Sequence, residues 1–244
     1  MTCLIVQARM NSQRLPGKVL RTVLGRPLLS YQIERLKRAR LVDELVVATS
    51  ANASDDPLAN YCKKEEVSVY RGPEDDVLER FFGAALEKKA SVIVRICADS
   101  PLVDPDVVDR VVRFYLERSA ALDYVCNFHP RTFPRGLDCE VFPFRVLEKV
   151  RRLAKDPKER EHVTTAIYAR PSDYRIGNVA QSLDQSGHRW TVDTPEDLEL
   201  ITRILTALYP ANPRFTTEDV LRLLEKYPEW SALNETVKQK GFYE

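Results

Sequence analysis

The sequence predicts an α/β fold built on a mainly parallel β-sheet with helices on both faces. Short, β-branched apolar runs alternate with segments whose apolar residues recur at helical spacing. Strands and helices in alternation are typical of parallel sheets that are covered on both sides. The chain has 244 residues and is 44% hydrophobic, which is ample for such a core.

The first half of the chain shows this alternation most clearly. Its apolar runs predict strands over residues 3–6, 44–48, 67–70 and 92–96. Each run is followed by an apolar stripe that predicts a helix packed on the core: Leu29, Ile33 and Leu36; Leu58, Tyr61 and Cys62; Leu78, Phe81, Phe82 and Ala85; Val108, Val111, Val112 and Tyr115.

The second half of the chain is less regular. Residues 129–143 contain three prolines and Gly136, which predicts an irregular segment. The apolar patterns around it predict strands over residues 124–127, 174–179 and 189–192, and helices over residues 145–154, 158–168 and 196–209.

We interpret this organisation as one domain over residues 1–210 with a C-terminal helical extension over residues 211–244. Residues 128–188 are expected to form a lid or substrate region inserted within that domain. In the extension, Thr216 or Thr217 is expected to cap a helix.

Residues 7–20, with the sequence QARMNSQRLPGKVL, form a candidate phosphate-binding loop. Arg9, Arg14 and Lys18 surround a Pro16–Gly17 turn directly after the first predicted strand. Open α/β sheets bind ligands at the carboxyl ends of their strands. Glycine lets backbone amides approach a phosphate, while Arg and Lys neutralise its charge.

The alternative for this loop is a solvated basic segment in which Pro16–Gly17 only makes a turn. A Walker P-loop is excluded, because Gly17–Lys18 is followed by Val19 rather than by Ser or Thr. Cations are seldom concentrated by chance directly after a first buried strand, so we favour phosphate binding.

Charge and hydropathy exclude two classes of partner. Lys and Arg number 37 against 36 Asp and Glu, so there is no bulk charge to hold a nucleic acid backbone. No apolar stretch approaches the roughly 20 residues that span a bilayer, and the N-terminus lacks a basic segment followed by an apolar core. The sequence therefore predicts a cytoplasmic protein that binds neither nucleic acid nor membrane.

Asp99 and Asp193 are the candidate metal ligands. Each follows a predicted strand, in the sequences CADSPLVDP and RWTVDTPEDL. One or two carboxylates combined with substrate phosphates suit Mg²⁺. Taken singly, Asp99 is better explained as a turn residue and Asp193 as a helix cap. Together with a cationic loop at the same sheet edge, they favour a metal site.

Six ordered motifs resemble the cytidylyltransferases of nucleotide-sugar biosynthesis: QARMNSQRLPGK, YRGPEDDVLERF, ADSP with VDPDVVD, PRGLDCEVF, EREHVT and RWTVDTPEDLEL. The resemblance is greatest to the spore coat polysaccharide biosynthesis branch, with Kdo and acylneuraminate cytidylyltransferases more distant. The Kdo enzymes are expected to carry an Asp-Glu-Pro turn where this chain has Asp99–Ser100–Pro101. The resemblance therefore does not choose the acceptor.

The resemblance implies a Rossmann-like nucleotidyltransferase fold that binds CTP and Mg²⁺ and forms a homodimer. It makes Arg14, Lys18, Asp99 and Asp193 the catalytic residues, with Mg²⁺ on the two aspartates. The nucleotide would contact Gln7, Ala8, Arg9, Ser12, Arg14, Lys18, Arg71, Gly72 and Asp75. For the acidic residues 74–76, the alternative is a first helical turn that complements the helix dipole.

Acceptor contacts are expected in the irregular middle of the chain, from Asn127, Arg135, Asp138, Glu140 and His162. For His162 the alternative is a buried histidine on the core-facing side of its helix. The neighbouring Arg160 and Glu161 would then form a solvated ion pair.

The resemblance, together with the cationic loop and the two aspartates, implies transfer of CMP from CTP to a sugar or sugar acid, with release of pyrophosphate, for surface polysaccharide biosynthesis. One alternative is a glycosyltransferase of related fold, although its usual Asp-x-Asp pair is missing after Asp99. Another is a CMP transferase acting on a non-sugar acceptor such as a phosphonate. A non-catalytic subunit is disfavoured, because Lys18, Asp99 and Asp193 are all present.

Overall fold

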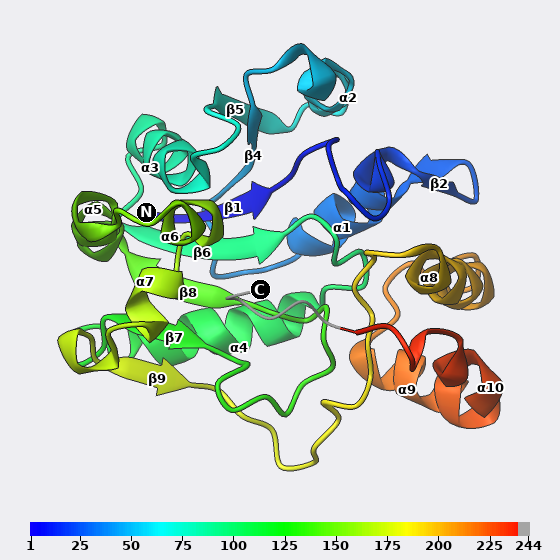
Figure 1. Cartoon of the computed structure of the whole chain (residues 1–244). Helices are drawn as coiled ribbons and strands as arrows, with labels where there is room; N and C mark the ends of the chain where they lie inside the picture. The colour runs from blue at the N-terminus through cyan, green and yellow to red at the C-terminus, as the bar shows by residue number, and fades with distance from the viewer. Residues whose placement is uncertain (239–244) are drawn as a thin grey trace.

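The computed structural model describes residues 1–238 and is drawn in Figure 1. Within this range seven strands form one sheet in the order β5-β4-β1-β6-β8-β7-β9. They are β1 (Thr2–Gln7), β4 (Glu44–Ser50), β5 (Ser68–Gly72), β6 (Val92–Cys97), β7 (Tyr124–Cys126), β8 (Glu140–Pro143) and β9 (Ile176–Asn178). Only β8 runs antiparallel to its neighbours in this sheet, which confirms the predicted α/β class.

The central strand β1 shows why these residues form a doubly covered sheet. Its side chains alternate between two hydrophobic clusters, with Leu4 and Val6 in one and Cys3 and Ile5 in the other. Since neighbouring side chains of a strand point to opposite faces, an uninterrupted apolar run must be covered on both sides.

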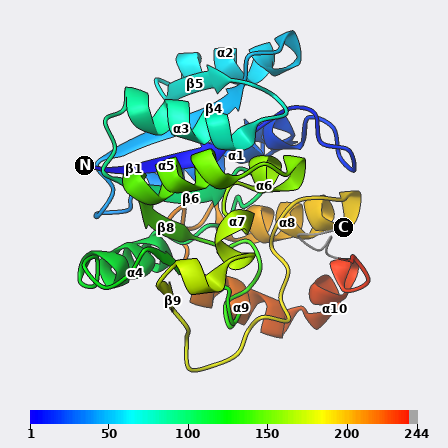
Figure 2. The same cartoon turned by 60° about the vertical axis from the view of Figure 1, so that its left-hand side comes forward.

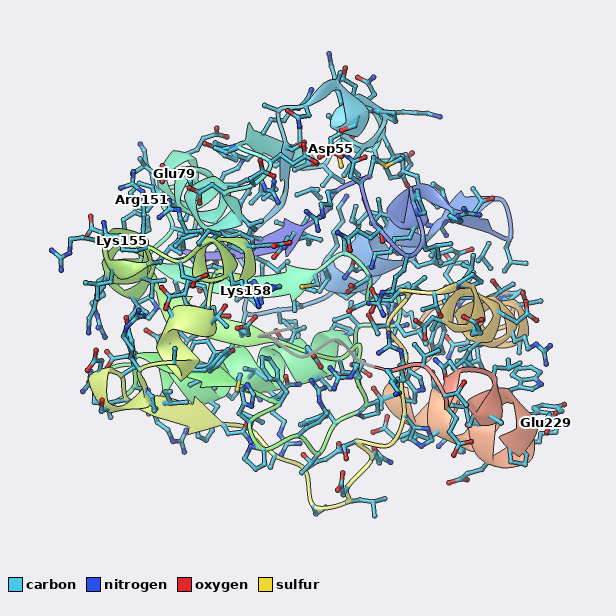
Figure 3. All side chains as sticks on the ribbon, viewed as in Figure 1. Asp55, Glu79, Arg151, Lys155, Lys158 and Glu229 are labelled. Carbon is cyan, nitrogen blue, oxygen red and sulfur yellow. The ribbon has the colours of Figure 1, made fainter. Side chains whose placement is uncertain are left out.

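Helices cover both faces of the sheet (Figure 2). The cluster containing Leu4 is closed by α1 (Leu28–Leu36), α2 (Asp56–Lys64), α4 (Pro105–Leu116), α8 (Pro195–Leu208) and α9 (Thr217–Lys226). The opposite cluster is closed by α3 (Val77–Glu87), α5 (Phe144–Leu153) and α7 (Thr165–Tyr168), with α6 (Pro157–His162) packed on α3. Figure 3 shows Glu79 of α3 beside Arg151 of α5, whose Nε lies 2.6 Å from a Glu79 oxygen.

Short elements connect these layers. The candidate phosphate-binding loop over residues 7–20, called the cationic loop below, ends in the 3₁₀ turn η1 (Lys18–Leu20). It is followed by the small antiparallel pair β2 (Thr22–Val23) and β3 (Arg26–Pro27). Two further 3₁₀ turns are η2 (Ala53–Asp55) and η3 (Pro171–Asp173).

Three sequence predictions in the second half were wrong. The helix predicted over residues 158–168 is two short helices, α6 and α7, separated at Val163, whose φ is +58°. Residues 189–192 do not join the sheet; Arg189 forms only an isolated bridge with Arg135. Conversely, the segment predicted to be irregular contains β8, because the surrounding prolines and Gly136 obscured a short strand pattern. Residues 128–188 thus supply β8 and β9 to the main sheet.

The C-terminal extension is helical, as predicted. It consists of α9, α10 (Pro228–Ser231) and the 3₁₀ turn η4 (Ala232–Asn234), which packs on α8. Thr216 caps α9 in a capping box with Asp219. Residues 239–244 of the predicted extension lie outside the described residues. Across residues 1–238, none of the helices combines the length and apolar character needed to cross a membrane.

Candidate functional site

The cationic loop after β1 is held in a defined shape by its own backbone and by Asp55. The carbonyl of Met10 accepts hydrogen bonds from the amides of Ser12 and Gly17, at 2.9 and 2.8 Å. Gly17 adopts a φ of +68°, which glycine tolerates best. The Met10 amide donates to Asp55 Oδ1 at 2.7 Å, and Figure 3 labels Asp55 beside the chain leaving β1. No sequence pattern pointed to Asp55, which is 1% exposed.

Lys18 lies between the two predicted metal ligands. Its Nζ donates to Asp99 Oδ2 at 3.1 Å and to Asp193 Oδ1 at 2.8 Å. Burial of the ammonium acts to lower the pKa of Lys18, but the two carboxylates outweigh burial and the pKa is raised. Lys18 is therefore a permanent cation at the centre of the site.

Asp193 forms ion pairs with three cationic side chains. Besides Lys18, its Oδ2 lies 2.9 Å from Arg14 Nη2 and 2.8 Å from Arg189 Nη2. Burial acts to raise the pKa of Asp193, but these cations outweigh it and the pKa is lowered. Arg189 was not predicted, although it stands four residues before Asp193 in the RWTVDTPEDLEL motif.

Asp99 lies at the end of β6, as predicted, and its backbone brings Asp193 to it. The Asp99 carbonyl accepts a hydrogen bond from the Val192 amide at 2.8 Å. Because β6 pairs with β1, the turn after β6 also lies beside the cationic loop. The four predicted catalytic residues, Arg14, Lys18, Asp99 and Asp193, thus meet at one edge of the sheet.

The chemistry of this donor set fits Mg²⁺. The carboxylates of Asp99 and Asp193 converge on one point, since a single ammonium nitrogen contacts both. Among residues 1–238, no group of three or more His, Cys, Asp or Glu side chains surrounds a common point. Two carboxylates with substrate phosphates and waters are the coordination that Mg²⁺ accepts.

The other predicted nucleotide contacts of the first loop line the same edge. Gln7 ends β1, and its Oε1 accepts a hydrogen bond from Arg95 at 2.9 Å. The Ala8 amide donates to Ala48 of β4, while Arg9 lies 3.4 Å from Glu161. Ser12 stands at the turn that Met10 closes. Their contacts with a nucleotide stay predictions.

The predicted base-proximal turn lies beside this loop. Asn11 of the cationic loop donates to Glu74 Oε1 at 3.0 Å, which joins the two segments. Arg71 is held by the carbonyls of Ser50 and Asn52, at 2.9 and 2.8 Å. Gly72 is buried and Asp75 is exposed. A nucleotide role for Arg71, Gly72 and Asp75 stays a prediction.

The acidic residues of that turn also have the structural role considered as an alternative. Asp76 caps α3, because its side chain accepts the Glu79 amide at 2.9 Å. Arg160 is no solvated partner of Glu161, since its Nε donates to Asp76 at 2.7 Å.

Glu140 and Asn127, two of the predicted acceptor contacts, have side chains occupied by protein donors and acceptors, and a role in acceptor binding stays a prediction. Glu140 is 3% exposed and forms an ion pair with Arg95. Its Oε1 accepts the hydroxyls of Tyr124, Thr164 and Tyr168, at 2.6, 2.6 and 2.8 Å. The amide of Asn127 donates to the Leu137 carbonyl and accepts the Cys139 amide, at 2.8 and 2.9 Å. Glu140 thus joins β8 to β6 through Arg95, and Asn127 joins the end of β7 to the segment before β8.

The other acceptor predictions, for Asp138, Arg135 and His162, are equally untested. Asp138 pairs with Arg131, whose Nη2 lies 2.8 Å from its Oδ2. Arg135 is partly buried, and burial is the largest influence on its pKa, which is lowered. The negative charge of Asp193 acts in the opposite direction. His162 ends α6 and is also partly buried; burial lowers its pKa.

Gly136 places the loop after Phe133 against the segment that carries Asp193. The Arg135 amide donates to the His188 carbonyl at 3.0 Å, and the Trp190 amide donates to the Arg135 carbonyl at 2.7 Å. Gly136 has a φ of +104°, and a Cβ there would lie 2.7 Å from the Trp190 carbonyl carbon. Only glycine allows this approach.

Gly136→Ala is therefore expected to displace the segment that carries Asp193 and to lower kcat of the predicted CMP transfer by about 10²-fold. A displacement of about 1 Å at reacting groups has an effect of that size. Gly25→Ala is the matched control, since Gly25 also has a positive φ, +75°, but no atom within 4 Å of an added Cβ. Steady-state kinetics of both variants checks this. Equal kcat values for the two variants would contradict it.

Comparison with known proteins shows the family to which this chain belongs. A family model described as cytidylyltransferase matches residues 3–226. An uncharacterized protein of Methanocaldococcus jannaschii is 34% identical over 242 residues, which cover 98% of this chain and 97% of that protein. The spore coat polysaccharide biosynthesis protein SpsF of Bacillus subtilis is 34% identical over 235 residues, which cover 92% of this chain and 94% of SpsF.

Solved structures are also similar over most of this chain. A cytidylyltransferase from Leptospira borgpetersenii has a TM-score of 0.92 at 31% identity, covering 98% of this chain and 99% of its own. A CMP:2-keto-3-deoxy-manno-octonic acid synthetase complexed with CTP has a TM-score of 0.65 at 19% identity, covering 84% and 98%, which shows likeness of fold alone. With a family match over most of its length, this chain belongs to the cytidylyltransferases.

Proposed function

We propose that this protein transfers CMP from CTP to a sugar or sugar acid and releases pyrophosphate. The observation that carries the proposal is the meeting of Arg14 and Lys18 with Asp99 and Asp193 at one sheet edge, within 3.1 Å of one another in each ion pair. Cations for a triphosphate and carboxylates for a divalent ion are what nucleotidyl transfer requires. The relation to SpsF supports a product used in polysaccharide synthesis.

The bonds made and broken are simple. A hydroxyl oxygen of the acceptor attacks the α-phosphorus of CTP, and the bond from that phosphorus to the bridging oxygen of the β-phosphate breaks. Pyrophosphate leaves with the electron pair. The hydroxyl proton goes to solvent, because a carboxylate held by three cations, as Asp193 is, makes a weak base.

The protein's contribution is positioning and charge neutralisation. Lys18 and Arg14 would bind the triphosphate and stabilise the negative charge that develops on the leaving pyrophosphate. Asp99 and Asp193 would hold Mg²⁺, which when bound withdraws charge from phosphate oxygens. The Lys18 ammonium would then be available to phosphate oxygens, since its two carboxylate partners, Asp99 and Asp193, would hold the ion.

A screen of nucleotides and acceptors tests this function. Purified protein with Mg²⁺ is given CTP, UTP, ATP or GTP together with sugar acids, neutral sugars or phosphonates, and pyrophosphate release is measured. We expect release with CTP and a sugar or sugar acid, and phosphorus NMR of the product should show a CMP diester. Asp193→Asn is the matched inactive variant, and the exposed Asp184→Asn is its control.

Two outcomes would decide against the proposal. Sugar transfer from a nucleotide sugar without pyrophosphate release would establish a glycosyltransferase. CMP transfer to a phosphonate but to no sugar would keep the chemistry and replace the acceptor class. A homodimer, which the resemblance implies, is also part of the proposal and is checked by sedimentation equilibrium.

A further inference from the structure

Asn234 of the C-terminal extension is buried, although the helix before it is not. Asn234 ends η4 and is 3% exposed, whereas α10 contributes no buried residue. Its Nδ2 donates twice, to Asp197 Oδ1 at 2.8 Å and to the Arg189 carbonyl at 2.9 Å. A buried amide whose two hydrogens are both bonded is specific to its partners. Both partners belong to the segment that carries Asp193.

Asp197 connects this amide to the guanidinium of Arg189 and to the backbone of Asp193. Its carboxylate is fully buried. Oδ1 accepts Arg189 Nε at 2.8 Å in addition to Asn234. Oδ2 accepts the amides of Asp193 and Thr194 at 2.9 and 3.1 Å. One carboxylate thus sets the conformation of the turn on which Asp193 stands.

Arg189 completes the connection. Its Nη2 donates to Asp193 Oδ2 at 2.8 Å, while the other oxygen of Asp193 contacts Lys18 at the same distance. The side chains of Arg189 and Asp193 are 10% and 14% exposed. The path from Asn234 through Asp197 and Arg189 to Asp193 therefore consists of short hydrogen bonds that are largely shielded from water.

The extension also contacts the segment that follows Asp99. At the start of α9, the amide and hydroxyl of Thr217 donate to Asp104 Oδ2 at 2.9 and 2.7 Å. Asp104 is 5% exposed and follows Asp99 by only five residues. Two points of the extension, Thr217 and Asn234, are thus attached to the segments that carry the two carboxylates proposed to share one metal ion.

We propose that Asn234 is a positioning residue, which orients Asp193 by holding Asp197 and the carbonyl of Arg189. The C-terminal extension is then a support of the active site. The proposal rests on the proposed function for the role of Asp193. Removing the Asn234 amide leaves Asp197 Oδ1 and the Arg189 carbonyl with one donor fewer each, so that the turn carrying Asp193 keeps its orientation toward Lys18 and Asp99 less well.

Hydrogen exchange of the free protein tests the positioning without any substrate. In Asn234→Ala, the amides of Asp193 and Thr194 are expected to exchange at least about 10-fold faster than in wild type, because local opening becomes easier. Asn212→Ala is the matched control: its Oδ1 accepts only the Arg214 amide at 2.9 Å, it is exposed, and it lies in the same extension. Unchanged exchange at Asp193 and Thr194, or faster exchange across the whole chain, would overturn the proposal.

Kinetics tests the consequence for catalysis. Asn234→Ala is expected to lower kcat about 10-fold or more while KM for CTP changes less than about 3-fold, as for loss of orientation rather than of binding. In an Arg189→Lys background the same change should alter kcat less than about 2-fold, because both variants break one path. Additive losses, or a kcat equal to that of Asn212→Ala, would overturn the proposal.

Two further measurements separate loss of positioning from loss of folded protein and from failure of the proposed function. Thermal unfolding shows whether Asn234→Ala is folded at the assay temperature; if it is not, Asn234→Ser, which keeps one hydroxyl donor, is measured and should lie between wild type and the loss described. If wild type releases no pyrophosphate with any nucleotide, the proposed function fails, and hydrogen exchange alone decides the role of Asn234.

Discussion

Lys18→Met is expected to lower kcat for nucleotidyl transfer by about 10²–10³-fold, the range found when one pre-positioned donor to a developing anion is removed. Methionine keeps much of the length and apolar stem of the side chain but lacks the ammonium that contacts Asp99 and Asp193 at 3.1 and 2.8 Å. Since those carboxylates raise the pKa of Lys18, wild type carries this charge throughout the neutral range. Steady-state pyrophosphate release from CTP measures the effect.

The control for this change is Lys37→Met, because Lys37 is exposed at the C-terminal end of α1. Its kcat should equal that of wild type. Thermal unfolding of both variants separates loss of catalysis from loss of folded protein. A kcat for Lys18→Met within about 3-fold of wild type would contradict electrostatic stabilisation by Lys18.

Glu140→Gln is expected to lower the free energy of unfolding by about 3–5 kcal/mol, as when one partner of a buried ion pair is removed. The substitution preserves shape but leaves Arg95, whose side chain is 11% exposed, without a counterion. Burial acts to raise the pKa of Glu140, but Arg95 and three hydroxyl donors outweigh it and the pKa is lowered, so wild type holds a full carboxylate here. Equilibrium unfolding in urea measures the loss.

Two further variants test whether the loss of stability comes from the buried charge. Glu117→Gln removes one partner of an exposed pair with Arg118, whose side chains are 57% and 46% exposed, and should change stability by less than about 1 kcal/mol. The double variant Arg95→Met/Glu140→Met should recover much of the loss, since apolar residues can replace a buried ion pair. Equal stability of Glu140→Gln and Glu117→Gln would show that the buried charge has no special role.

Part of the site could be predicted because it follows from strand order along the chain. Lys18 and Asp99 come shortly after two apolar runs, and such runs become adjacent parallel strands whose carboxyl ends share one edge. Asp193 was placed correctly for a different reason than expected. The segment before it is no strand of the sheet; its Val192 amide is instead bonded to the carbonyl of Asp99.

The α/β class, the cationic loop and the two carboxylates could be recognised from the chain alone, because apolar periodicity and turn residues are properties of short segments. That Glu140 is a buried partner of Arg95, 45 residues away, and that Asn234 reaches Asp197 across 37 residues became visible only in the folded chain. Buried polar groups need partners, but the partner is chosen by how distant segments pack, and no local pattern records that choice.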